Sequence, residues 1–132
     1  MDVKKHVTGV QHIGIPTTNM DETVCFYQSL GFVTEYQTIN EKADEKVAFL
    51  TLSNLTMEVY ENKKAVMAVG AIDHVALDVT DIDQVFEFVR QNGFTLLDDK
   101  VQSLPFWEHG VKFFTILGPN KEKIEFCEKL KS

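Results

Sequence analysis

The sequence predicts an α+β fold in which two βαβββ repeats form a shared curved sheet. The first observation is an internal repeat, because residues 10–32 of the 132-residue chain align without gaps on residues 72–94. The second is a change of periodicity, because each copy passes from a short β-rich run to apolar residues at helical spacing. A sequence repeat of this kind indicates two copies of one supersecondary unit.

Each repeat is expected to contain one helix with recognisable ends. Asn19, followed by Glu22, resembles an N-terminal capping box, and Asp81 is expected to cap the second helix. Gly31 and Gly93 stand where helices often end with a residue in the left-handed conformation. The repeats therefore carry equivalent helices in equivalent places.

Three strands are expected after each helix, and the two copies end alike, as MEVYE and IEFCE. The expected strands are residues 32–39, 47–52 and 55–61 in the first repeat and residues 95–101, 111–117 and 123–128 in the second. Turn residues separate the last two strands in both copies, Ser53-Asn54 and Gly118-Pro119-Asn120. We place repeat one at about residues 8–62 and repeat two at about residues 70–130, within a single domain spanning residues 1–132.

Composition excludes several classes of partner. Thirteen basic and twenty acidic side chains give a net charge of -7, which opposes binding to nucleic acid and to anionic membranes. No stretch approaches the roughly 20 apolar residues that span a bilayer, so a cytoplasmic protein is expected. Cys25 and Cys127 lie far apart and form neither a disulfide framework nor a thiolate metal motif.

Four polar residues occupy predicted strands at equivalent places of the two repeats. They are His12 and Glu58 in the first repeat and His74 and Glu125 in the second. Strand residues alternate between faces, so these side chains should point away from the helices. The neighbours expected to pack on the helices are Ile13, Ile15, Met57, Val59, Val75, Leu77, Ile124 and Phe126.

Polar residues on an open sheet face are common, and a lone histidine is more often structural than a ligand. Two histidines and two glutamates in equivalent positions nevertheless favour a single divalent cation in a concave cleft. Imidazole and carboxylate ligands without thiolate suit Ni, Zn, Co, Mn or Fe(II), and coordination positions left to water would make the ion a Lewis acid.

With these features the chain resembles the vicinal oxygen chelate superfamily, which includes glyoxalase I, bleomycin-resistance proteins, methylmalonyl-CoA epimerase and dioxygenases. The resemblance covers nearly the whole chain and is carried by residues 11–32, LTMEVYE, residues 73–94 and EKIEF. The His-Glu-His-Glu set is most similar to bacterial glyoxalase I, which implies His12, Glu58, His74 and Glu125 as metal ligands. An epimerase-like chain is expected to carry Gln where Glu58 stands.

The resemblance implies a lyase or isomerase of the glyoxalase I type that acts on a small vicinal-oxygen substrate, such as a thiol hemiacetal of a 2-oxoaldehyde. Glu125 or Glu58 would then move the proton. One alternative is another enzyme on this fold, such as a thiol transferase, an epimerase or an epoxide-opening enzyme. A second is a non-enzymatic, small-molecule-binding resistance protein. Short members of the family also imply a homodimer.

Four further residues are candidates for substrate binding. Asn62 matches an asparagine that contacts substrate in glyoxalase I, while Phe106, Trp107 and His109 lie in an expected loop that either lines the pocket or packs locally. Glyoxalase I holds glutathione with an arginine shortly after the first histidine, where this chain has Pro16. The thiol part of the substrate is therefore left open.

Overall fold

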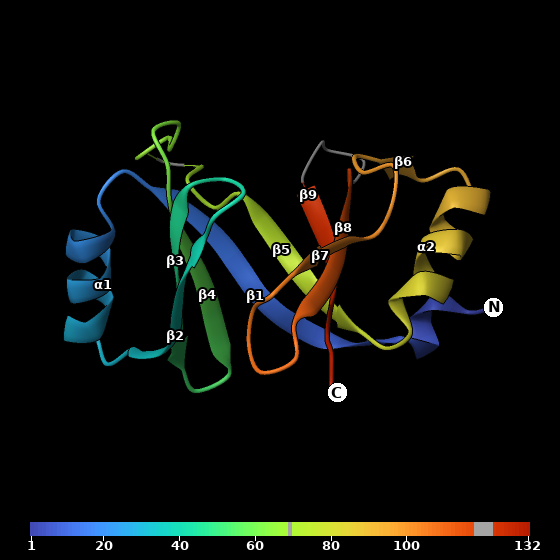
Figure 1. Ribbon diagram of the computed structural model, residues 1–132, viewed down its shortest axis with the longest axis horizontal. Coiled ribbons are helices and arrows are strands. Elements are labelled where there is room, and N and C mark those ends of the chain that lie inside the picture. Colours follow the sequence, from blue (N-terminus) through green and yellow to red (C-terminus); the bar gives the residue numbers. More distant parts are fainter. Residues whose placement is uncertain (69, 118–122) are drawn as a thin grey trace. The chain divides into compact units, whose positions relative to one another are not determined.

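A computed structural model describes residues 1–68, 70–117 and 123–132 (Figure 1). Its contacts divide the chain into two compact units. We call residues 12–73 the N-terminal module, and residues 1–11 together with residues 74–132 the C-terminal module. The boundary falls within strand β1 (Val7–Thr17), so one strand contributes residues to both modules.

In the N-terminal module, β1 leads into helix α1, and three strands follow (Figure 1). These elements are α1 (Met20–Ser29), β2 (Val33–Asn40), β3 (Glu45–Leu52) and β4 (Leu55–Glu61). The strand order is β2-β3-β4-β1, with β4 antiparallel to β3 and parallel to β1. Its core forms where Met20 and Val24 of α1 pack on buried residues of the sheet such as Leu50 and Val59.

The C-terminal module repeats this arrangement. Its elements are η1 (Val3–Lys5), β5 (His74–Val79), α2 (Ile82–Gln91), β6 (Thr95–Leu96), β7 (Gln102–Leu104), β8 (Val111–Leu117) and β9 (Lys123–Lys129). The strand order is β5-β9-β8-β6, with β7 also paired to β8 and β5 parallel to β9. Val85 and Val89 of α2 pack on Phe114 and Phe126. The predicted α+β fold with two βαβββ modules is thus confirmed.

No helix in the described part of the chain is long and apolar enough to cross a membrane. The predicted glycine positions after both helices are confirmed, since Gly31 and Gly93 have φ of 104° and 77°. The turn at Ser53-Asn54 is also present between β3 and β4. The predicted turn at residues 118–120 lies outside the described residues.

The strand predicted over residues 95–101 is wrong as a single element, because β6 and β7 are separate short strands. Between them, the Asp98 carboxylate accepts a hydrogen bond from the Thr115 backbone N–H at 2.7 Å. The Leu97 N–H donates to the Thr115 carbonyl at 2.9 Å. A side chain therefore replaces the backbone partner at this place on β8, and the ladder is interrupted.

The prediction that Asn19 caps α1 is confirmed, but the reciprocal backbone bond of a capping box is replaced, because the Asn19 backbone N–H donates to Thr17 Oγ1 at 3.1 Å. The Asn19 side chain accepts a hydrogen bond from the Glu22 N–H at 3.0 Å and donates to the Glu22 carboxylate at 3.3 Å. The prediction for Asp81 is wrong, since its side chain makes no capping hydrogen bond within the described structure. Its φ of 54° lies in the left-handed region, unlike the extended N-cap conformation of Asn19.

A glutamate at the end of each module's last strand reaches the N-terminus of its helix. Glu61 accepts a hydrogen bond from the Met20 N–H at 2.7 Å. Glu128 accepts from the Ile82 N–H at 3.0 Å and from the Asp81 N–H at 3.3 Å. Both carboxylates also face the positive end of the helix dipole. The final glutamates of MEVYE and IEFCE therefore have the same structural role, which explains why the two copies end alike.

Candidate metal centre

In the N-terminal module, His12 and Glu58 lie side by side on neighbouring strands. Their Nε2 and Oε1 atoms are 3.4 Å apart, and the side chains are only 4% and 15% exposed. Gly14 of β1 stands opposite Glu58 of β4 in the parallel ladder. His12, two residues before Gly14, points to the same face and meets Glu58 diagonally.

The C-terminal module contains the same pair in the same register. Ala76 of β5 stands opposite Glu125 of β9, and His74 precedes Ala76 by two residues. The His74 Nε2 and Glu125 Oε1 atoms are 3.9 Å apart, with side chains 10% and 13% exposed. In both modules the residue opposite the glutamate is small, which leaves space beside the carboxylate.

The apolar neighbours of these pairs pack on the helix side of each module. In the N-terminal module they join the core against α1, and in the C-terminal module the core against α2. The residues concerned are Ile13, Ile15, Met57, Val59, Leu77, Ile124 and Phe126. Val75 is an exception to the prediction, being 37% exposed at the beginning of β5, ahead of the residues that reach the core. The His–Glu pairs therefore occupy the sheet face opposite each helix.

The spacing of the paired atoms is compatible with cation binding. Imidazole and carboxylate donors lie about 2.0–2.2 Å from zinc-like ions, so neighbouring ligands of one ion are separated by about 3.0–3.5 Å. The His12–Glu58 distance of 3.4 Å falls in this range. The His74–Glu125 distance of 3.9 Å requires a shift of about half an ångström, which a small side-chain rotation can supply. The residues of each pair therefore fit a divalent cation.

Aromatic and acidic side chains surround the pair in the N-terminal module. The Phe49 ring meets the His12 imidazole edge-on, with centroids 5.6 Å apart. Tyr60 follows Glu58 by two residues on β4 and so shares its face. The pKa of the Tyr60 hydroxyl is raised well above its usual range, mainly because the group is buried. The negative charge of Asp73, the hydrogen bond to the Asp73 carboxylate and the charge of Glu58 raise it further. The phenol therefore remains a hydrogen-bond donor.

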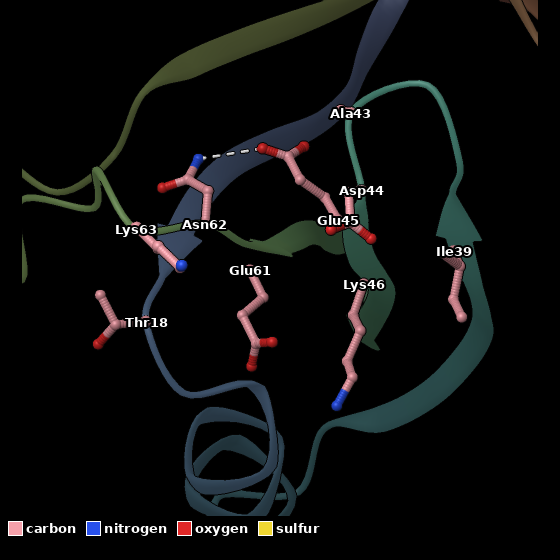
Figure 2. Close-up of a pocket in the computed structure, with 9 residues that line it drawn as sticks. All are labelled: Thr18, Ile39, Ala43, Asp44, Glu45, Lys46, Glu61, Asn62 and Lys63. Carbon is pink, nitrogen blue, oxygen red and sulfur yellow. Dashed lines mark hydrogen bonds between the residues drawn. The ribbon is translucent and has the colours of Figure 1, made fainter.

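Asn62 lies in a pocket of the N-terminal module with a volume of about 680 Å³ (Figure 2). Its side-chain N–H donates to Glu45 at 3.2 Å, and its side-chain oxygen accepts from the Lys64 backbone at 2.9 Å. Lys46, Lys63 and the helix-capping Glu61 also line this pocket. The Asn62 amide is thus part of a local hydrogen-bond network, and its role toward a substrate stays a prediction.

The loop that contains Phe106, Trp107 and His109 contacts the end of β9 at Lys129, whereas Glu125 lies near the beginning of β9. Phe106 is buried, and Lys129 Nζ lies 3.9 Å from the centroid of the Trp107 ring. His109 Nε2 is 3.7 Å from a carboxylate oxygen of the exposed Glu108. The loop joins β8 where Val111 pairs with Lys129, whereas Thr115 pairs with Glu125. Lys129 and Glu125 are four residues apart on β9, which corresponds to about 13 Å along the strand.

Two sets of residues with clear roles in the structure were not predicted from the sequence. One is the Tyr60–Asp73 hydrogen bond, and the other is the pair of helix-capping glutamates, Glu61 and Glu128. The repeated endings MEVYE and IEFCE held the signal for the second set. Alternation from Glu58 was the only sequence signal for Tyr60, and Asp73 was recognisable only as the residue before His74.

Comparison with known proteins gives a family and a set of similar folds. Residues 11–115 match the sequence model described as the glyoxalase/bleomycin resistance protein/dioxygenase superfamily. No curated protein matches the chain.

Similar solved structures include methylmalonyl-CoA epimerase from Mycobacterium tuberculosis, with 21% identity, a TM-score of 0.79, and coverage of 99% of this chain and 94% of that one. A variant of methylmalonyl-CoA epimerase from Streptomyces coelicolor, in complex with 2-nitronate-propionyl-CoA, has 22% identity, a TM-score of 0.75, and coverage of 95% and 99%. A hypothetical protein from Bacillus halodurans has 24% identity, a TM-score of 0.73, and coverage of 93% and 95%. These likenesses establish a shared fold.

Proposed function

The chain belongs to the glyoxalase/bleomycin resistance protein/dioxygenase superfamily, and from this premise we propose that it is a metal-dependent enzyme that moves a proton on a carbon next to a carbonyl group. The observation that carries the proposal is the His–Glu pair built in the same register in both modules. A structural role for one such pair would be ordinary. Its repetition, with a small residue opposite each glutamate, supports a shared chemical purpose.

We propose His12, Glu58, His74 and Glu125 as ligands of one divalent ion, drawn from Ni, Zn, Co, Mn and Fe(II). Two imidazoles and two carboxylates carry enough negative charge to hold such an ion without a thiolate. The ion would supply Lewis-acid stabilisation of negative charge on substrate oxygens. A site that takes one pair from each repeat also accounts for the position of all four residues in the sequence.

The glutamates are the candidates for proton transfer. Glu58 and Glu125 are mostly shielded from water, at 15% and 13% side-chain exposure. Either carboxylate, in its ionised form, would accept the proton from the substrate carbon and later return it. Limited access of water would keep that proton from being lost to solvent before it is returned. Both residues remain candidates for the base.

The substrate class that we favour is an acyl thioester, in which the proton returns to the carbon it left. Support comes from the fold that the chain shares with methylmalonyl-CoA epimerases. A glyoxalase-type reaction on a thiol hemiacetal is the second candidate, and Glu58 favours it, because a glutamine is expected at this position in an epimerase. Both reactions begin with the same proton abstraction. We also retain the proposal that the chain forms a homodimer.

Metal analysis tests the proposal first. Elemental analysis of gently purified protein, with titration of metal-free protein by Ni, Zn, Co and Mn, is expected to give about one ion per chain. His74→Ala and Glu125→Ala should lose the ion, whereas the matched control His109→Ala, on the loop beyond β7, should keep it. Unchanged metal content in His74→Ala and Glu125→Ala would refute the site.

Proton exchange then separates the two substrate classes. The metal-loaded protein is incubated in D₂O with methylmalonyl-CoA or with the hemithioacetal of methylglyoxal. Incorporation of deuterium next to the thioester carbonyl, followed by NMR, is the expected result for an epimerase. Conversion of the hemithioacetal to a hydroxyacyl thioester would instead select the glyoxalase type. No turnover of either compound by the metal-loaded protein would contradict both assignments.

A further inference from the structure

Tyr60 and Asp73 join three segments of the N-terminal module. The Tyr60 hydroxyl on β4 donates a hydrogen bond to the Asp73 carboxylate. The Asp73 backbone N–H donates to the Gly14 carbonyl of β1 at 2.7 Å. Gly14 itself stands opposite Glu58 in the β1–β4 ladder. Asp73 is thus held by its side chain to β4 and by its backbone to β1.

Asp73 is also the residue that directly precedes His74, and His74 is the first residue of β5. The first residue of a strand has paired neighbours in only one direction along the strand, whereas an interior residue has them in both. His12 is in a different situation, because five residues of β1 come before it. His74 therefore lies at the end of its ladder, where it pairs with Lys123 of β9, and the residue before it is held by Tyr60 and Gly14.

We propose that Tyr60, acting through Asp73, is a positioning residue for the His74 imidazole. The inference rests on the proposed metal-dependent function, because positioning matters most for a ligand. The hydrogen bond to Tyr60 orients the Asp73 carboxylate, and the hydrogen bond to Gly14 fixes the Asp73 peptide. Together they restrict the backbone from which His74 extends. Outer hydrogen bonds of this kind commonly change metal affinity by 10–100-fold.

The C-terminal module supports a specific role for this tyrosine. Cys127 follows Glu125 by two residues, as Tyr60 follows Glu58, so the two occupy equivalent places in the repeat. A thiol is a weak hydrogen-bond donor and is too short to reach as far as a phenol. The residue before His12, the equivalent of Asp73, is Gln11, whose side chain donates to Asp78 at 2.9 Å. Gln11 also donates to the Cys127 backbone carbonyl at 3.4 Å, so the equivalent residues are joined through the backbone and not through a hydroxyl and a carboxylate.

Tyr60→Phe tests the proposal, because it removes one hydroxyl and leaves the ring and the charge of Asp73 in place. Tyr27→Phe is the matched control. It removes the same hydroxyl group from a tyrosine of α1, whose ring packs against Phe32. Titration of metal-free protein with Co²⁺ should show affinity about tenfold lower in Tyr60→Phe and unchanged in Tyr27→Phe. The visible spectrum of the bound Co²⁺ should also shift in Tyr60→Phe alone.

A second measurement does not need metal. NMR of ¹⁵N-labelled imidazoles in the metal-free protein should show changed signals for His74 in Tyr60→Phe, with unchanged signals for the distant His109. Asp73→Asn keeps a side-chain oxygen that can accept from Tyr60, so it should restore the wild-type His74 signal more closely than Asp73→Ala does. The aspartate variants also provide a test if Tyr60→Phe folds poorly.

The outcomes separate this inference from the proposed function. Wild-type protein that takes up no Co²⁺ would refute the metal site, while the His74 signals would still decide whether Tyr60 positions the ring. Wild-type protein that binds Co²⁺, with identical affinity and identical His74 signals in Tyr60→Phe, would overturn the positioning role alone. A melting temperature lowered equally in Tyr60→Phe and Tyr27→Phe, with no change in His74, would assign Tyr60 a purely structural role.

Discussion

Glu125 and Glu128 lie three residues apart on β9 and face opposite sides of the sheet, so exchanging each for glutamine should separate chemistry from stability. Glu125 stands next to His74 on the site face. Glu128 reaches the N-terminus of α2, where it accepts from the backbone N–H groups of Asp81 and Ile82. The two substitutions are chemically identical and differ only in the face on which they act.

The magnitude for Glu128→Gln follows from its two hydrogen bonds. Hydrogen bonds to a charged acceptor contribute about 1.5–3 kcal/mol, and neutral ones about 0.5–1.5 kcal/mol. Glutamine keeps one oxygen, so one bond is weakened and the other is lost, and the attraction to the helix dipole, about 0.3–1 kcal/mol, disappears. Because Glu128 is only partly buried and Asp81 is exposed, the lower end of these ranges applies. We expect a loss of about 2 kcal/mol in the free energy of unfolding, which corresponds to a melting temperature roughly 6–10 °C lower.

Urea unfolding and elemental analysis on the same protein preparations provide the assay. Glu128→Gln should lose stability and keep its metal content, whereas Glu125→Gln should lose metal and change the metal-free stability by less than about 1 kcal/mol. In the N-terminal module, Glu61→Gln should likewise lose stability and keep its metal content, because Glu61 accepts a hydrogen bond from the Met20 N–H at the beginning of α1. Equal stability of metal-free Glu128→Gln and wild-type protein would refute the capping argument.

Two further predictions concern stability. Leu50 is a fully buried residue of β3 in the core that also contains Met20 and Val24 of α1. Leu50→Ala should lower the free energy of unfolding by about 3 kcal/mol in urea titrations, and a loss below about 1 kcal/mol would contradict the assigned core. The raised pKa of Tyr60 stabilises the fold fully below the ordinary value of 10.0 and progressively less above it. The free energy of unfolding of the wild-type protein should therefore fall above about pH 10, by at most about 1.4 kcal/mol per pH unit and by less with solvent screening. The fall should be less steep in Tyr60→Phe than in Tyr27→Phe.

The repeat made much of the fold predictable from sequence. Aligning His12 with His74 predicted two equivalent strands, and Gly31 and Gly93 predicted where the two helices end. Alternation then assigned Glu58 and Glu125 to the face opposite the helices. The structure adds the ladder register, in which each histidine lies two residues before the partner of its glutamate. Local periodicity specifies the face of a residue, but register depends on pairing between distant segments.

Interactions between distant residues explain what the sequence did not predict. Asp81 has the residue type of an N-cap, but Glu128, 46 residues beyond Ile82 in the chain, occupies that role. The strand expected over residues 95–101 is divided because Asp98 bonds to β8, a contact that composition cannot indicate. In both cases a distant side chain replaces the expected hydrogen-bond partner of a backbone group. Such a partner cannot be predicted from the residues that are neighbours in sequence.

The two modules have the same backbone register, and they differ at the position two residues beyond each glutamate. Because Tyr60 and Cys127 share a face with Glu58 and Glu125, a substitution there leaves the packing on the helices unchanged. In the C-terminal module, Asp78 on this face bonds to the side chains of Thr8 and Gln11, which belong to the start of β1. In the N-terminal module, Tyr60 instead bonds to the residue before His74. Substitutions on this face, which lies opposite the helices, are therefore where the repeats acquire different hydrogen-bond partners.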